Sequence, residues 1–158
     1  MRNNQPVTHI EYQVPPGSAI ISHTDFKGTI TFVNEDFIAA SGFSRAESVG
    51  APHNIVRHPD IPPGVFRDAW ATIAAGRPWQ GIVKNRRKNG DYYWIKATMS
   101  PLPDGTGYMS VRVRANASDV AAAEALYARR RADPSIRLDQ GQLVGAACPD
   151  GLRVPSEP

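Results

Sequence analysis

The stretch WQGIVKNRRKNGDYYWIKATMSP, residues 79–101, decides the fold because it holds two runs of strand-forming residues around the tripeptide KNG. Asparagine followed by glycine between such runs is a strong β-hairpin signal. A two-residue loop would pair Val83 with Lys96, whereas a three-residue loop with a left-handed glycine pairs Val83 with Ile95. We predict the second register, because it collects apolar side chains on one face and leaves the other to charged ones: Lys84, Arg86 and Lys96.

Asn85 is the informative residue of this register. It pairs with Tyr93, as Gly81 does with Ala97, and its amide points inward among apolar neighbours. A buried amide needs hydrogen-bond partners. The edge of a planar heterocycle such as a flavin pyrimidine would satisfy both its donor and its acceptor, and so would the backbone. Trp79 opens the same face, where it would line a pocket, although packing is the usual role of a buried tryptophan.

The remaining elements predict an α+β fold. Period-2 alternation indicates strands at residues 19–25, 29–34 and 107–115, and a short strand pair within 136–144. Helices are expected at 35–42 after the N-cap Asn34, at 44–50 after Ser44, at 63–76, and at 118–131 after Ser118 or Asp119. The result is a five-stranded antiparallel sheet with short helices over one face and a C-terminal projecting helix. A ligand would lie between helices and sheet.

The totals exclude several classes of protein. The chain has 158 residues, 41% of them hydrophobic, and a net charge of +3, which suits one globular domain. Its one cysteine, Cys148, allows no internal disulfide. No run of about 18 apolar residues occurs, so we expect a soluble cytoplasmic protein without a membrane span. The basic runs 84–88 and 128–131 are predicted to be solvated surface, without nucleic-acid binding.

The stretch HNIVRHPD, residues 53–60, gathers titratable groups beside prolines that limit any helix there to one turn. Catalysis would need a nearby nucleophile, and a metal site would need a standard ligand spacing; neither is present. Two interpretations remain open. The stretch is either a solvated turn or an anion cradle, in which the planar donors of Arg57 and a second donor, His58, would bind phosphate.

Four stretches together resemble the PAS domain of bacterial aerotaxis receptors: TDFKGTITFVNEDFIAASGFS, GAPHNIVRHPDIPPGVFRDAW, GRPWQGIVKNRRKNGDYYWIKA and GYMSVRVRA. The match covers residues 5 to about 130, and VRHPD with VKNRRKNGDYYW is specific to that subgroup. The resemblance implies a signalling domain without enzymatic activity. It would hold FAD non-covalently between helices and sheet, and the redox state of the flavin would be its signal.

By position, the resemblance assigns flavin binding or signalling to six residues: Asn34, Arg57, His58, Asp60, Trp79 and Asn85. The hairpin register adds Tyr93, which lies on the same inward face. Asp68 falls on a further position important in that family, with a structural role expected. No catalytic residue and no metal ligand is expected. The stretch at 53–60 would then be the anion cradle.

The residues and the resemblance together predict the organisation of the chain. The polar composition of residues 1–17, which end in Pro15, Pro16 and Gly17, predicts a flexible N-terminal arm. A PAS sensor domain at 18–116, a signalling helix at 117–133, and a linker with a disordered tail at 134–158 follow. The linker resembles the segment before the membrane anchor of such receptors. The chain would thus be either the sensor portion of a longer receptor at the inner face of the membrane or a stand-alone protein. Its partners would be a downstream relay or methyl-accepting module, another protein, or a second copy in a homodimer.

The residues exclude two other functions and leave two open. A light-oxygen-voltage photosensor needs a cysteine beside the flavin, and Cys148 is far from that region. A flavin reductase needs a nicotinamide site, for which no glycine-rich dinucleotide fold is found. A haem-binding gas sensor stays open, since His53 or His58 would serve as axial ligand. A cofactor-free PAS interaction module that dimerises through the arm and the last helix also stays open.

Overall fold

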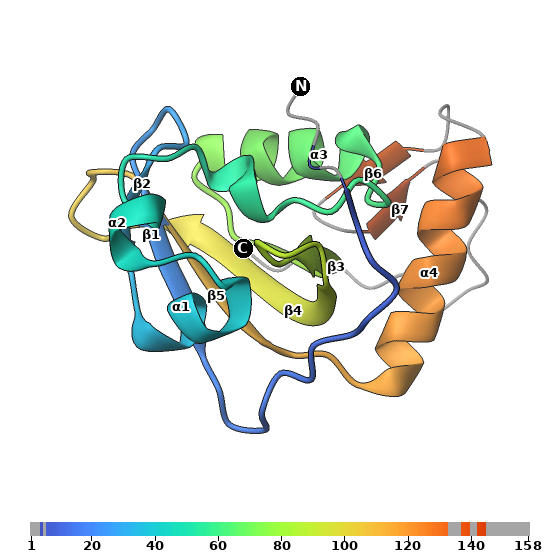
Figure 1. Ribbon diagram of the computed structural model, residues 1–158. Coiled ribbons are helices and arrows are strands. Elements are labelled where there is room, and N and C mark those ends of the chain that lie inside the picture. Colours follow the sequence, from blue (N-terminus) through green and yellow to red (C-terminus); the bar gives the residue numbers. More distant parts are fainter. Residues whose placement is uncertain (1–3, 5, 133–136, 140–141, 145–158) are drawn as a thin grey trace.

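The computed structural model describes residues 4, 6–132, 137–139 and 142–144. Its centre is one antiparallel sheet in the order β2-β1-β5-β4-β3 (Figure 1). The five strands are β1 Ile20–Thr24, β2 Ile30–Val33, β3 Trp79–Arg86, β4 Tyr92–Pro101 and β5 Tyr108–Arg114. The predicted α+β fold with a five-stranded antiparallel sheet is therefore confirmed.

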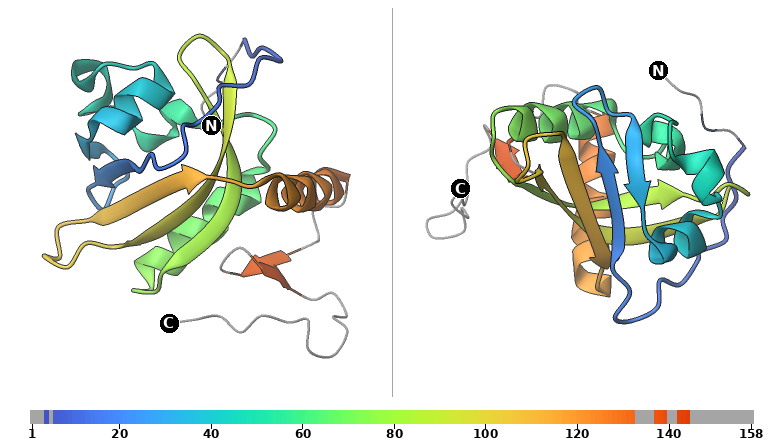
Figure 2. Two further views of the ribbon diagram at one scale, coloured as in Figure 1. Left: turned by 90° about the horizontal axis from the view of Figure 1, so that it is seen from below. Right: turned by 90° about the vertical axis from the view of Figure 1, so that its left-hand side faces the viewer.

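The helices divide into a covering group and one separate helix. The covering group consists of α1 Glu35–Ser41, α2 Arg45–Ser48, the 3-10 helix η1 His53–Val56, and α3 Pro63–Ala74. The separate helix α4, Ala117–Ala132, follows β5 and stands apart from the others (Figure 2). The short strands β6 Arg137–Asp139 and β7 Gln142–Val144 pair with each other, as predicted.

The hairpin β3–β4 has the predicted register. Val83 pairs with Ile95, Asn85 with Tyr93, and Gly81 with Ala97. Gly90 adopts φ 99° at the loop, a conformation that glycine reaches without steric cost. As a consequence, Asn85 is only 4% exposed and lies on the covered face of the sheet.

Two of the three predicted helix caps are confirmed. The side chain of Asn34 accepts a hydrogen bond from the Phe37 amide, and Ser44 forms a reciprocal capping box with Glu47. The predicted cap of the last helix is wrong. The Asn116 side chain accepts from the Asp119 amide at 2.8 Å, so α4 begins just before the expected cap, Ser118 or Asp119.

The N-terminal arm is packed along the hairpin. The Tyr12 amide donates to the Tyr92 carbonyl at 2.7 Å, the Tyr92 amide donates to the Ile10 carbonyl at 3.1 Å, and Val14 is buried. The expectation of a flexible arm, based on its polar composition, is wrong for residues 6–14. Backbone hydrogen bonds to an exposed strand edge need no particular side chains, so the composition of the arm does not reveal them.

The basic runs also make more contacts than a solvated surface would. Arg86 donates twice to the Pro6 carbonyl, and Lys84 forms a 2.9 Å ion pair with Asp60. In the second run, Arg131 donates to the Asp60 carbonyl. The prediction of solvated surface is wrong at these positions, because the acceptors, two backbone carbonyls and the Asp60 carboxylate, belong to segments that are distant in sequence.

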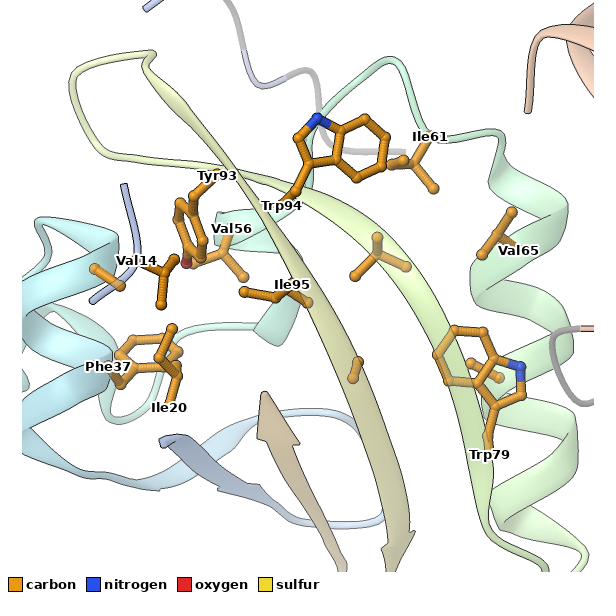
Figure 3. Packing of buried hydrophobic residues seen from close by; sticks show 14 of the residues in the cluster. Val14, Ile20, Phe37, Val56, Ile61, Val65, Trp79, Tyr93, Trp94 and Ile95 are labelled. Atoms are coloured by element: carbon orange, nitrogen blue, oxygen red, sulfur yellow. The ribbon is translucent and has the colours of Figure 1, made fainter. Parts of the chain in front are cut away.

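Buried apolar side chains form one cluster that extends along β4 (Figure 3). Tyr93 points toward Phe37 and Ile20 at one end, whereas Trp79 faces Val65 of α3 at the other. The sheet thus packs against α1 at one end and against α3 at the other.

Arg87 should stabilise the fold more than its neighbour Lys88. The Arg87 guanidinium donates to the Ala40 and Ala39 carbonyls at 2.7 and 3.0 Å, at the C-terminal end of α1, where positive charge is favoured. The Lys88 side chain forms an exposed ion pair with Glu47, while its backbone amide donates to the Ser41 carbonyl, a bond that a side-chain substitution keeps. We expect Arg87→Met to lower the free energy of unfolding by about 1–2 kcal/mol, and Lys88→Met by less than about 0.5 kcal/mol. Urea denaturation of both variants measures this, and equal losses would contradict it.

Candidate functional site

A cavity of about 690 Å³ lies between the helical layer and the covered face of the sheet. This volume falls within the range of small-molecule and cofactor sites. The helical side supplies His53, Asn54, Val56, Arg57, Pro63, Phe66, Arg67, Ala69, Trp70 and Ala71, and the sheet supplies Trp79, Val83, Asn85, Ala97, Met99, Ser110 and Arg112. The walls are mainly apolar, with a few polar groups at separate points.

Three of the seven predicted site residues line this cavity: Arg57, Trp79 and Asn85. Four do not: Asn34, His58, Asp60 and Tyr93. Tyr93 lies directly across the strand pair from Asn85, and burial raises the pKa of its hydroxyl. A direct flavin contact by any of the seven stays a prediction.

Trp79 is held in one orientation from two sides. Its indole Nε1 donates to Asp68 Oδ2 at 2.8 Å. Its ring lies over Gly81, where a Cβ atom would come within 2.4 Å of ring carbon Cη2. Asp68 therefore positions a wall of the cavity, in agreement with the structural role expected for it.

Arg57 lies at the edge of the cavity, where η1 meets β3. Its guanidinium stacks over the Phe66 ring, 4.5 Å from the ring centroid, and its backbone bridges to Asn85. Partial burial, and then the nearby charge of exposed Arg67, lower the pKa of Arg57. Two neighbouring cations without an intervening carboxylate make this edge suitable for an anion.

The most unusual group in the cavity is Arg112, which the sequence did not single out. Its side chain on the central strand β5 is 2% exposed. Nη1 lies 3.2 Å from His53 Nε2, Nη2 donates to Ser22 Oγ, and Nε has no partner. No ion pair among the described residues includes Arg112, and burial lowers its pKa to about 10.

The sequence hides Arg112 because alternation on β5 suggests the opposite orientation. Val111 and Val113 would ordinarily face the core, yet Val113 is exposed and Arg112 is buried. A signal existed in the neighbouring strand. Ser22 of β1 pairs directly with Ser110 of β5, so two strands turn polar residues to the same covered face.

His53 and His58 differ in position and in exposure, since His58 is buried and His53 is partly exposed. Burial, and then the charge of Arg112, lower the pKa of His53 to about 3. Because a guanidinium only donates, the neutral His53 accepts at Nε2 and carries its proton on Nδ1. His58 lies outside the cavity lining, where its Nδ1 accepts from the Asp60 amide at 3.0 Å. Burial, and then the charge of Lys84, lower the pKa of His58 to about 4.

Asp60 faces α4 and not the cavity. Besides its ion pair with Lys84, it borders a second hollow together with Tyr127 and Arg131 of α4. The stretch at 53–60 thus has two sides: Arg57 lines the cavity, and Asp60 lies beside α4.

Asn34 has its whole amide in use at the start of α1. Its Oδ1 accepts from the amides of Phe37 and Ile21, each at 3.0 Å, and its Nδ2 donates to the Ala19 carbonyl at 2.7 Å. These bonds tie α1 to β1.

Metal and haem ligation find little support in these positions. Among residues 4 and 6–132, no group of three or more His, Cys, Asp or Glu side chains is arranged to hold a metal ion. Of the two proposed haem ligands, His53 already accepts from Arg112 through Nε2, and His58 does not line the cavity. No helix in the described part of the chain has the length and apolar character needed to cross a membrane.

Comparison with known proteins points to one family. A family model described as the PAS fold matches residues 30–113. The aerotaxis receptor of Escherichia coli (strain K12) is 43% identical over 148 residues, which are 91% of this chain and 29% of the receptor. The chain thus spans less than a third of that relative.

Solved structures support the same fold. A PAS domain from Colwellia psychrerythraea matches with a TM-score of 0.56 and 20% identity, covering 61% of this chain and 86% of that domain. A light-oxygen-voltage domain studied with a flavin analogue matches with a TM-score of 0.57 and 18% identity, covering 73% of this chain and 87% of that one. At such identities the likeness concerns the fold alone.

Replacing Asn34 should test its structural role. Asn34→Ala removes three hydrogen bonds and a helix cap, so we expect the free energy of unfolding to fall by about 2–3 kcal/mol. Asn34→Asp keeps both acceptor contacts, so its free energy of unfolding should fall clearly less. Urea denaturation of the ligand-free variants gives both values, and an Asn34→Ala variant as stable as the wild type would refute this role.

The free energy of unfolding should decrease as the pH is lowered below about 6.5, because the pKa values of His58 and His53 are lowered in the folded protein. The folded-state pKa of His58, about 4, lies below the ordinary value of 6.5, so the unfolded chain takes up a proton first as the pH is lowered. Between pH 6.5 and 5 this costs up to about 2 kcal/mol for His58, with a similar loss from His53.

His58→Asn keeps an acceptor for the Asp60 amide and removes the titrating ring. Urea unfolding between pH 7 and 5 should then show roughly half the wild-type loss of stability, while exposed His9→Gln should behave as wild type. A His58→Asn profile parallel to the wild-type profile would refute this assignment.

Proposed function

This chain belongs to the PAS family, and we propose on that basis that its cavity binds FAD and that it is a redox sensor of the aerotaxis-receptor type. The single observation that carries the proposal is the composition of the cavity wall. Broad apolar and aromatic surfaces enclose the space, a buried amide borders it at Asn85, and cations border it at Arg57 and Arg112. A planar ring system with a polar edge, joined to phosphates, matches that combination.

The residues divide into a ring site and a phosphate site. Trp79, Val83 and Ala97 offer apolar surface for a ring system, with the Asn85 amide beside them. Arg57 and Arg67, at the more open edge, would pair with the two phosphates of FAD. Arg57 is already oriented by its stacking on Phe66, which reduces the entropy lost on binding.

When bound, FAD would supply a ring whose charge and hydrogen-bonding pattern change on reduction. The chain's part is to respond at Asn85, whose strand β3 also carries the anchor of α4. The Tyr127 hydroxyl of α4 donates to the Ile82 carbonyl, three residues before Asn85, and Arg131 donates to the Asp60 carbonyl. A shift of β3 or of the cradle loop would therefore change the seating of α4.

We further propose that α4 passes this change to a downstream relay or methyl-accepting module in the cytoplasm. The likeness to a receptor that is longer than this chain supports such a partner. In this scheme residues 18–116 sense, residues 117–133 transmit, and the chain is a signalling module and not a catalyst.

Absorption of the purified protein tests the cofactor directly. We expect a two-banded flavin spectrum that bleaches with dithionite and returns in air, with FAD and not FMN released on denaturation. A Soret band would replace the proposal with haem sensing. No visible absorbance after incubation with FAD would favour a cofactor-free module.

Asn85→Ala tests the signal separately from binding. Hydrogen exchange of α4 should differ between the oxidised and reduced wild-type protein, and this difference should disappear in Asn85→Ala while FAD remains bound. Asn89→Ala, at the exposed hairpin tip, is the matched control and should respond as wild type. A redox-dependent difference that persists in Asn85→Ala would refute the signalling role of this residue.

A further inference from the structure

A buried guanidinium without a carboxylate partner is an uncommon feature of a protein interior. Arg112 lines the cavity at 2% exposure, and none of the ion pairs found among the described residues involves it. Buried charges in proteins are normally paired, because removing a lone charge from water is strongly unfavourable. A missing anionic partner therefore needs an explanation.

The two groups that hydrogen-bond to Arg112 satisfy part of its donors but not its charge, and the Phe37 ring, whose centroid lies 5.4 Å from the guanidinium carbon, adds a cation–π contact without an anion. Ser22 accepts through its hydroxyl oxygen and His53 accepts through Nε2. Both are neutral, since burial holds the pKa of His53 at about 3. One donor, Nε, has no partner at all. The net result is one positive charge without an anionic partner among the described residues, held in place at the wall of the cavity.

We propose that Arg112 binds the flavin ring and that its charge makes the cavity bind reduced, anionic flavin more tightly than oxidised flavin. The inference rests on the proposed function, and it concerns the form of the ligand that the site prefers. Reduction of a flavin by two electrons with uptake of one proton leaves one negative charge on the ring. In a low-dielectric site that charge interacts strongly with a nearby guanidinium.

The position of Arg112 favours the ring over the phosphates as its partner. Arg112 is on β5, the middle strand of the sheet, and is fully buried. Arg57 and Arg67, by contrast, lie on the helical side, half-buried and exposed respectively. A pyrophosphate keeps two charges in either redox state and is better accommodated at the hydrated edge. The deep cation is then left for the part of the ligand whose charge changes.

The role of His53 follows from the same geometry. A protonated His53 would place a second cation 3.2 Å from Arg112 Nη1, so the buried pair is stable only with His53 neutral. His53 then acts as a positioning residue that fixes the guanidinium together with Ser22.

Binding measurements on three variants test the proposal. Arg112→Met removes the charge and keeps an unbranched apolar side chain, Arg112→Lys keeps the charge without the fork, and Arg114→Met makes the same charge change at an exposed position two residues along β5. Dissociation constants are measured for oxidised FAD, for FAD reduced with dithionite under anaerobic conditions, and for riboflavin, which lacks phosphate.

The expected pattern is specific to a ring contact. Wild type and Arg114→Met should prefer reduced FAD, and Arg112→Met should lose this preference by about tenfold or more. Arg112→Lys should retain part of it. Arg112→Met should weaken the binding of oxidised FAD and of riboflavin by the same factor. Arg57→Gln, by contrast, should weaken the binding of FAD and leave that of riboflavin nearly unchanged. A loss confined to FAD would assign Arg112 to the phosphates and overturn the proposal.

Stability of the ligand-free protein provides a readout independent of binding. Since Arg112 would be an uncompensated charge until flavin binds, ligand-free Arg112→Met should unfold at the same urea concentration as wild type or a higher one. A lower midpoint would mean that Arg112 is a structural residue, and would overturn the proposal. Wild type that binds neither form of FAD would refute the proposed function as well, whereas unchanged binding by Arg112→Met would refute this inference alone.

Discussion

The register of the β3–β4 hairpin is the constraint on which the rest of the cavity depends. Side chains alternate along a strand, so a shift of one residue would turn Asn85, Val83 and Trp79 away from the helical layer. The three-residue loop closed by Gly90 prevents this shift. The same loop is held against the arm and α1 by backbone and guanidinium hydrogen bonds. Contacts far from the cavity therefore determine which side chains line it.

The covered face of the sheet carries apolar side chains at its two ends and polar side chains in its middle. At the two ends, Tyr93 points toward Phe37 and Trp79 faces Val65, and all four side chains are buried (Figure 3). Between them, Ser22, Ser110 and Arg112 take positions that a purely structural core would give to aliphatic residues. Such a substitution of polar for apolar groups lowers stability unless a ligand compensates for it. Apolar packing at the ends thus stabilises the fold, while the polar groups in the middle line the cavity.

Much of this arrangement was predictable from local sequence, and the rest depended on distant contacts. Asn-Gly chemistry, strand alternation and the caps at Asn34 and Ser44 act over a few residues, so the hairpin register and the first helices were predicted correctly. Arg112 was missed because its environment comes from β1 and η1, and alternation on β5 alone suggested that it faces solvent. The packed arm and the bound arginines were missed for the same reason, since their partners are backbone carbonyls that no residue type reveals.

The loop at 53–60 is held from both ends of the described chain. Near the N-terminus, the Asn4 amide donates to the Asn54 and Arg57 carbonyls at 2.8 and 2.6 Å. From α4, Arg131 donates to the Asp60 carbonyl. Each contact is to backbone, so it depends on the path of the loop and is insensitive to its side chains. If a ligand draws Arg57 into the cavity, the carbonyls of this loop must move with it, and both ends of the chain would respond to one event. The path of this loop, and with it the position of Arg57 at the cavity edge, therefore depends on two segments that do not line the cavity.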